Sequence, residues 1–220
     1  GDGVADIAIG PDTGGGPRLQ VLAGKTFGKL MPDFFGLPYP DFRGGLRLAI
    51  ADVNRDGHGE LIVAPGAGGG PRVSVYNGRS IGPGKNPTVL INDFFVFDAS
   101  LRTGISLAAG DVNGDGYADL IAGIDTGGGP RVRVISGAEL AAGRGGAIAD
   151  FWAGGIDDRS GLRLSVRNYD GDNRADIMVG SGAGTFVRTY TGSSVIGNPN
   201  PSPIEWFESF PGVGGGVYVG

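Results

Sequence analysis

Acidic and amide side chains recur along this chain in a fixed order, and their oxygen atoms could bind a metal ion. The clearest copy places them at loop positions 1, 3, 5 and 9, with glycine at position 6: Asp111, Asn113, Asp115, Gly116 and Asp119. Oxygen ligands around a tight turn suit a hard cation, and calcium takes about six to eight of them. We therefore predict a calcium site in this loop, with the backbone carbonyl of Tyr117 as a ligand at position 7.

Three further copies of this loop extend the prediction. The expected ligands are Asp52, Asn54, Asp56, the His58 carbonyl and Glu60 in the second repeat, and Asn168, Asp170, Asp172, the Arg174 carbonyl and Asp176 in the fourth. The first repeat keeps Asp2, the Val4 carbonyl and Asp6, so we expect an incomplete site there. Asp and Asn that cap their own turns could explain one copy. They do not explain three crowded acidic loops, because like charges repel unless neutralised. We expect about three calcium ions, with a fourth at the first loop left open.

The spacing of these loops predicts the fold. Glu60 follows Asp6 by 54 residues, Asp119 follows Glu60 by 59, and Asp176 follows Asp119 by 57. A period of this size is typical of stacked or radially arranged units. Each repeat has four short apolar runs between Gly and Pro, which in the third repeat are 105–109, 119–123, 132–135 and 149–152. Such runs are typical of strands, and the best helix candidate is the brief segment 138–142.

Four antiparallel strands per repeat are typical of a β-propeller blade. We therefore predict an all-β fold, a β-propeller of four four-stranded blades in a single domain over residues 1–220. Residues 216–219 align with first strands such as 46–51, so they are expected to complete the first blade and close the ring. The sequence leaves open whether the chain is complete or a piece of a longer protein.

The repeats resemble the FG-GAP/VCBS family, on residues 111–123 (DVNGDGYADLIAG) and their counterparts in the other repeats. That family comprises calcium-binding propeller repeats of integrin α-subunit heads and of bacterial extracellular proteins. The resemblance covers essentially the whole chain. It implies a secreted or surface-exposed adhesion or binding module, and it implies no particular ligand.

A glycine turn followed by arginine also recurs, as Gly-Gly-Gly-Pro-Arg ending at Arg18, Arg72 and Arg131. An ungapped count places Arg188 at the same point of the fourth repeat. Each Arg could simply pair with a nearby carboxylate between blades. Alternatively, four Arg side chains could surround the face opposite the metal loops and bind anionic sugars or carboxylates. Asp12 and Asp125 occur only in alternate repeats, which suggests a duplicated two-blade unit.

Aromatic pairs recur in the fourth strand of each repeat, and we expect at least one member of each to pack in the core. The pairs are Phe34-Phe35, Phe94-Phe95, Phe151-Trp152 and Trp206-Phe207. Trp152 and Trp206 could also serve as platforms for sugars.

The composition excludes several function classes. The net charge of −5 and the pI near 4.8 argue against a nucleic-acid partner. Cysteine is absent, and no apolar run is long enough to span a membrane. The single histidine, His58, lies at a loop position whose side chain points away from the metal. Asp157 and Asp158 could form an acid–base pair, but a solvated loop explains them, so we predict that the chain is not an enzyme.

The predicted function is a calcium-stabilised extracellular propeller for adhesion, surface assembly or ligand binding. Its partner would be a protein or a carbohydrate at the cell surface, and self-assembly is a further option. Two alternatives are a lectin-like module and an accessory domain of a secreted polysaccharide-degrading enzyme.

Overall fold

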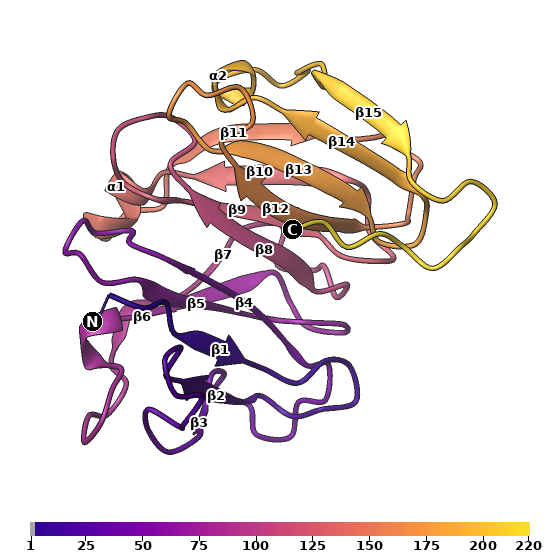
Figure 1. The fold of residues 1–220 in the computed structure, drawn as a ribbon. Helices are drawn as coiled ribbons and strands as arrows, with labels where there is room; N and C mark the ends of the chain where they lie inside the picture. The colour runs from indigo at the N-terminus through magenta and orange to yellow at the C-terminus, as the bar shows by residue number, and fades with distance from the viewer. Residues whose placement is uncertain (1–2) are drawn as a thin grey trace. The chain divides into compact units, whose positions relative to one another are not determined.

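The computed structural model describes residues 3–220 and shows an all-β chain in two compact units. The first unit contains residues up to Asp52 and 56–104; the second contains 53–55 and 105–220. The predicted all-β class is confirmed (Figure 1). No helix within residues 3–220 is long and apolar enough to span a membrane.

The first unit holds two antiparallel sheets. One has the strand order β1-β2-β3 and the other the order β4-β5-β6-β7. The strands are β1 (Ile7–Ile9), β2 (Arg18–Leu22), β3 (Phe34–Phe35), β4 (Leu46–Ala51), β5 (Glu60–Pro65), β6 (Arg72–Tyr76) and β7 (Val89–Phe95). A 3-10 turn, η1 (Gly78–Ser80), follows β6.

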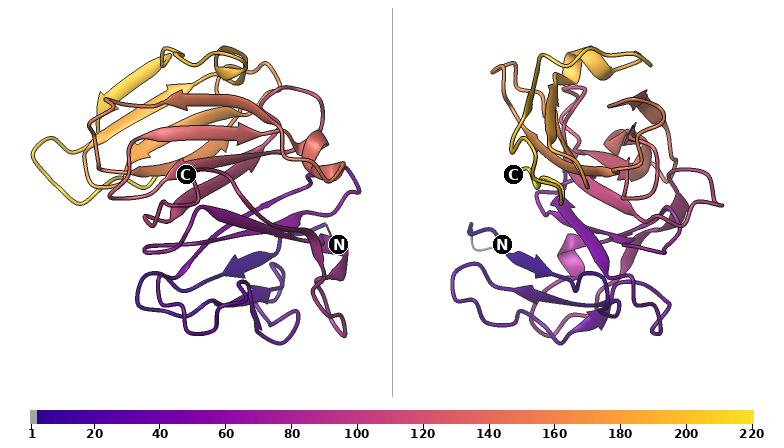
Figure 2. Two further views of the ribbon diagram at one scale, coloured as in Figure 1. Left: turned by 180° about the vertical axis from the view of Figure 1, so that it is seen from behind. Right: turned by 90° about the vertical axis from the view of Figure 1, so that its right-hand side faces the viewer.

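The second unit holds two four-stranded sheets, in the orders β8-β9-β10-β11 and β12-β13-β14-β15 (Figures 1 and 2). Their strands are β8 (Ile105–Gly110), β9 (Asp119–Ile124), β10 (Arg131–Ile135), β11 (Ala147–Trp152), β12 (Leu162–Arg167), β13 (Asp176–Ser181), β14 (Phe186–Tyr190) and β15 (Glu205–Glu208). Helix α1 (Gly137–Ala141) follows β10, close to the predicted position, and a short α2 (Gly192–Val195) follows β14. The consecutive strand order is that of propeller blades, as predicted.

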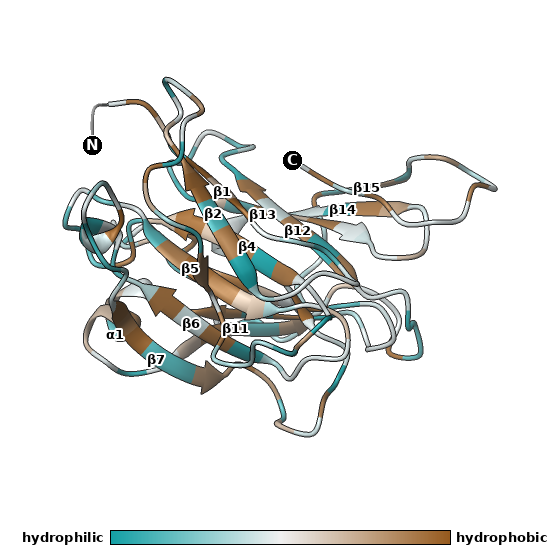
Figure 3. Ribbon diagram, turned by 90° about the horizontal axis from the view of Figure 1, so that it is seen from below, coloured by the Kyte–Doolittle hydropathy of each residue, from teal (hydrophilic) through white to brown (hydrophobic). Residues whose placement is uncertain are grey.

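The second strand of each complete blade is the core strand. All six residues of β5 and all six of β9 are buried, which explains their nearly continuous apolar sequences. In the first unit, Leu19, Leu46 and Val63 belong to one apolar cluster. In the second unit, Ile121, Phe151 and Leu162 belong to another. Figure 3 shows hydrophobic residues along the strands and more hydrophilic ones in the loops.

A glycine with positive φ precedes the first strand of a blade. Gly161 has a φ of +69°, and a Cβ placed on it would lie 2.2 Å from the Thr126 backbone nitrogen. Only a residue without a side chain permits this close approach between blades. The equivalent glycines also have positive φ; they are Gly45, Gly104 and Gly216.

The C-terminal segment lies against the last blade, as the first strand of a following blade would. The Val217 N–H donates to the Ser181 carbonyl at 2.8 Å, and the equivalent bond in the first unit joins Leu46 to Pro11, also at 2.8 Å. The predicted closure is not formed, however. In the described chain the β1 sheet has three strands, and 216–219 is not a strand. Glycine at 212 and 214–216 makes this segment entropically costly to order.

Each unit carries one cross-blade ion pair, at the two aspartates that occur in alternate repeats. Asp12 binds Arg47 at 2.8 Å in the first unit, and Asp125 binds Arg163 in the second. The Asp125 side chain is 4% exposed, whereas that of Asp12 is 67% exposed. This equivalence supports the interpretation of a duplicated two-blade unit.

Gly161→Ala should lower the free energy of unfolding by about 2 kcal/mol or more, because it combines left-handed strain with a clash. Gly155→Ala is the matched control, since a Cβ there meets nothing within 4 Å. Urea unfolding of both variants measures the difference, and equal stability would contradict the assigned role of Gly161.

Asp125→Ala should lower the free energy of unfolding by up to about 3 kcal/mol, because it removes the buried carboxylate that pairs with the half-buried Arg163. Asp12→Ala should cost less than Asp125→Ala, because the Asp12 side chain is 67% exposed and water already screens its pairing with Arg47. Thermal melts of both variants test this contrast. Equal losses would show that burial does not set the strength of the pair.

Candidate functional site

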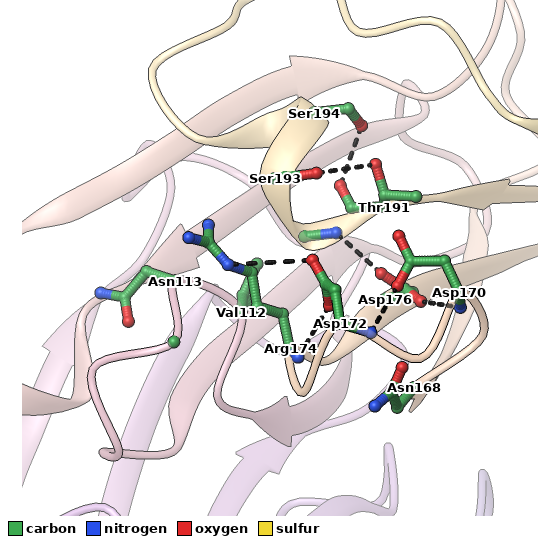
Figure 4. A network of polar contacts seen from close by, with 12 residues as sticks. Val112, Asn113, Asn168, Asp170, Asp172, Arg174, Asp176, Thr191, Ser193 and Ser194 are labelled. Atoms are coloured by element: carbon green, nitrogen blue, oxygen red, sulfur yellow. Dashed lines mark hydrogen bonds and ion pairs between the residues drawn. The ribbon is translucent and has the colours of Figure 1, made fainter.

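The fourth acidic loop gathers three carboxylates in a small space. One oxygen from each of Asp170, Asp172 and Asp176 lies within 4.8 Å of the others (Figure 4). It is the one such group of three acidic side chains found within residues 3–220. Asp170 and Asp172 are exposed and Asp176 is buried, so the cluster opens to solvent on one side.

The loop's own backbone fixes these side chains. Asn168 Oδ1 accepts the Gly171 N–H at 2.6 Å, Asp170 Oδ1 accepts the Asp172 N–H at 3.1 Å, and Asp172 Oδ1 accepts the Arg174 N–H at 2.9 Å. Asn173 at position 6 has a φ of 65°, so Asn adopts the left-handed turn that glycine makes elsewhere, as predicted. The Arg174 guanidinium lies 3.9 Å from Asp172.

The third loop has the same construction. Asp111 accepts the N–H groups of Gly114 at 2.7 Å and Gly116 at 2.8 Å, and Asp115 accepts that of Tyr117 at 2.9 Å. The Asn113 amide donates to Asp115 at 2.9 Å. The side chains at positions 1, 3 and 5 are therefore oriented by the backbone turn that they surround.

The carboxylate at position 9 joins this loop to the end of the third strand. Asp119 accepts N–H groups of Val112 at 2.9 Å and Asn113 at 3.3 Å within the loop, and that of Gly137 at 2.9 Å after β10. Asp176 does the same in the fourth repeat. It accepts the N–H groups of Tyr169 at 2.6 Å and Asp170 at 3.2 Å within the loop, and that of Gly192 at 2.9 Å after β14. Both carboxylates are fully buried. Burial raises the pKa of Asp119 to about 6, although these hydrogen bonds favour its charged form.

The second loop makes part of the same hydrogen-bond pattern. Asp52 accepts the N–H groups of Asp56 at 3.0 Å and Gly57 at 2.9 Å, and Glu60 is fully buried. Asp56 also pairs with Arg79 at 2.8 Å. Asn54 and His58 are half-buried.

In the first repeat, Asp6 accepts the Gly24 N–H at 3.2 Å. Asp6 and Val4 are exposed, and Asp2 lies outside the described residues.

The glycine-turn arginines contact carboxylates of the fourth strand in their own blade. Arg131 binds Asp150 through two bonds, at 2.6 and 2.8 Å, and Arg72 binds Asp93. Burial would raise the pKa of Asp150, but Arg131 and Arg133 outweigh it and lower the pKa. The pairing interpretation is therefore supported at these two arginines, although the partner lies within the blade and not between blades.

The arginines also stack on exposed aromatic rings of the fourth strand. Arg18 lies 5.5 Å from the Phe35 ring centroid, Arg72 lies 4.9 Å from that of Phe95, and Arg131 lies 6.0 Å from that of Trp152. Phe151 is buried as predicted, whereas Trp206 and Phe207 are both exposed. The core prediction therefore fails for the last pair, since all four residues of β15 are exposed.

Arg188 is not the fourth member of this set. Val187 pairs with Gly180, as Val132 pairs with Gly123, so Arg188 occupies the register position of Arg133. The glycine turn of the fourth repeat is two residues shorter than those of the other repeats, so an ungapped count from the position 9 carboxylate reaches the wrong arginine. The Arg188 guanidinium stacks on Phe186 at 4.2 Å and donates to the Ala153 carbonyl. The predicted ring of four equivalent arginines is therefore wrong.

Two repeated features escaped the sequence analysis. An acidic residue precedes each of the four aromatic pairs, at Asp33, Asp93, Asp150 and Glu205. A second arginine folds back onto carbonyls of the connection before each new blade. Its contacts are at 2.6–2.9 Å, and the residues are Arg43, Arg102 and Arg159. Alignment of the repeats by strand register would have revealed both.

Family comparisons match the region of the second and third loops. An FG-GAP-like repeat model matches residues 52–122, and an FG-GAP repeat model matches residues 103–150. The chain contains FG-GAP repeats. The predicted resemblance is confirmed at that level, and the match does not extend to the VCBS or bacterial type. A comparison with curated proteins found no significant match.

Among solved structures, one similar to this FG-GAP chain is a lectin from Agrocybe aegerita that specifically recognises non-reducing terminal N-acetylglucosamine. The two are 18% identical, with a TM-score of 0.47. The similarity covers 94% of this chain and 53% of the lectin, so the chain spans about half the length of that structure.

The raised pKa of Asp119 predicts a pH dependence in the presence of a chelator. The unfolded carboxyl ionises near 3.8 and the folded one near 6. Ionisation of this group therefore lowers the free energy of unfolding as the pH rises between these values, by up to roughly 3 kcal/mol. Melts at pH 5 and pH 7 measure the effect. Asp119→Asn is the control, and an unchanged pH dependence in that variant would contradict the assignment.

Proposed function

We propose that this chain is a non-catalytic, extracellular binding module in which calcium rigidifies the acidic loops and the opposite, glycine-turn face binds the ligand. The fourth loop is the observation that carries the calcium part. Two oxygens that bind one calcium ion at about 2.4 Å cannot lie more than about 4.8 Å apart. The carboxylates of Asp170, Asp172 and Asp176 meet that limit.

The donor set also fits calcium in its chemistry. The side chains at positions 1, 3, 5 and 9 of the complete loops offer oxygen alone, and calcium prefers carboxylate, amide and carbonyl oxygens. In the fourth loop, one oxygen of Asp170 and one of Asp172 accept loop N–H groups, which orients the other oxygen of each carboxylate. We extend the proposal to the second and third loops, for about three ions. The fourth ion, at the first loop, remains a prediction because Asp2 lies outside the described residues.

A binding role suits the chain better than catalysis. Asp158 accepts the Ser160 N–H at 2.8 Å within a turn, and Asp157 is exposed. A turn of this kind accounts for both carboxylates without an acid–base role. Turnover of a polysaccharide that is lost in Asp157→Asn or Asp158→Asn would restore the enzyme-accessory alternative.

The partner would be a protein or a carbohydrate at the cell surface. The glycine-turn ends of the blades are the favoured contact surfaces, because Phe35 and Phe95 in the first unit and Trp152 in the second are exposed, and aromatic residues are enriched in binding sites. Self-assembly is the rival use of this face, and it would appear as concentration-dependent oligomers in sedimentation experiments.

The double variant Asp170→Asn/Asp172→Asn tests the calcium proposal. It should bind one ion fewer per chain and lose the stabilisation that this ion gives, about 2.7 kcal/mol at a calcium concentration 100-fold above Kd. In chelator it should be at least as stable as the wild type, because it removes like-charge repulsion. Asp157→Asn is the matched control. Calcium-independent melting of the wild type would refute the proposal.

A further inference from the structure

A small hollow opens in the first unit, between its two sheets, on the glycine-turn side. Its volume is about 190 Å³. The connection that follows β3 contributes Pro38, Tyr39 and Phe42, and the second sheet contributes Arg72, Ser74 and Asp93. A second hollow of about 330 Å³ shares Leu37, Pro38, Ser74 and Asp93 with the first. The two hollows are therefore neighbours along one groove.

The groove exists because a small residue occupies one register position. Ser74 pairs with Val63 on β5, Arg133 pairs with Ala122 on β9, and Arg188 pairs with Val179 on β13. These three partners each lie three residues after the acidic residue at position 9. In the second unit the long side chains bind locally: Arg133 to Asp150, and Arg188 to the Ala153 carbonyl. Ser74 leaves that volume open.

The polar groups of the groove form a balanced set of donors and acceptors. Arg72 pairs with Asp93 and donates to the Tyr39 hydroxyl at 3.1 Å. Since the guanidinium and the carboxylate neutralise each other, an anionic ligand gains little here. The Arg72 Nε atom is buried and has no hydrogen-bond partner.

The apolar groups lie beside these polar groups. Tyr39 and Phe35 are each about half exposed, at 50% and 48%, and Phe35 lines the second hollow. Aromatic rings next to a carboxylate, a guanidinium, a hydroxyl and the Asn92 carboxamide suit a ring with one apolar C–H face and several hydroxyl groups. The first hollow is smaller than the roughly 300–1,000 Å³ of sites for drug-sized ligands, so it fits one such ring.

We propose that this groove binds a neutral oligosaccharide, with one sugar ring in each hollow. The proposal rests on the binding-module function and assigns its ligand class. Asp93 accepts hydroxyl protons, Arg72 donates to ring or hydroxyl oxygens, and Tyr39 packs against a C–H face. Two adjacent hollows favour a chain of at least two sugars over a monosaccharide.

The test begins with a glycan array of neutral and acidic oligosaccharides, probed with the calcium-loaded protein. Titration calorimetry then compares the best neutral oligosaccharide with its monosaccharide. We expect neutral oligosaccharides to bind, with the monosaccharide at least tenfold weaker. Tyr39→Ala and Ser74→Arg should each weaken binding at least tenfold. Trp206→Ala, which changes an exposed ring in the other unit, should alter affinity less than twofold.

Several outcomes would overturn the proposal: binding of acidic glycans alone, binding of peptides in place of glycans, no glycan binding, or glycan binding that Tyr39→Ala leaves unchanged. Because Ser74 is buried and its replacement could disturb folding, the exposed Tyr39 provides the independent variant. If calcium still stabilises the protein while glycans do not bind, this inference alone fails. If calcium has no effect on melting, the proposed calcium-stabilised module fails as well.

Discussion

In the third and fourth repeats, the buried carboxylate at position 9 links the acidic loop to the chain after the third strand, and the rest of the blade depends on it. In the third repeat, Asp119 holds the metal loop through Val112 and the chain after β10 through Gly137. Asp176 makes the equivalent contacts in the fourth repeat. A buried charge is tolerated only when hydrogen bonds or an opposite charge compensate it. The loop must therefore keep its turn conformation for the blade to fold.

This constraint separates the two faces of each blade by chemistry. At one end, carboxylates crowd a turn and offer oxygen atoms suited to a cation. At the other end, the arginines Arg72 and Arg131 are already neutralised by Asp93 and Asp150. A face whose charges are paired and whose aromatic rings are exposed is better suited to neutral ligands than to anions. In the proposed function, the calcium loops and the ligand groove are separate parts, and calcium would contribute to binding through the rigidity of the blade.

Much of the fold could be predicted because local patterns determine it. The buried strand 119–124 is a short apolar run, and the turn glycine at 116 marks its loop. The position of Arg188 could not be predicted from spacing, because the deletion lies inside a glycine turn and only strand register locates it. Predicting the Arg131–Asp150 pair likewise requires the register between β10 and β11. Residues 216–219 do not form the expected strand, although the Val217 N–H makes the inter-blade bond of a first strand.

A crystal structure grown with calcium, with anomalous diffraction collected to locate the ions, tests the central claim most directly. The account predicts an anomalous peak in the fourth loop, bound by oxygens of Asn168, Asp170, Asp172 and Asp176, with equivalent peaks in the second and third loops. Ordered water in the fourth loop, without an anomalous peak at saturating calcium, would contradict it. The carboxylates would then serve only to shape the turn.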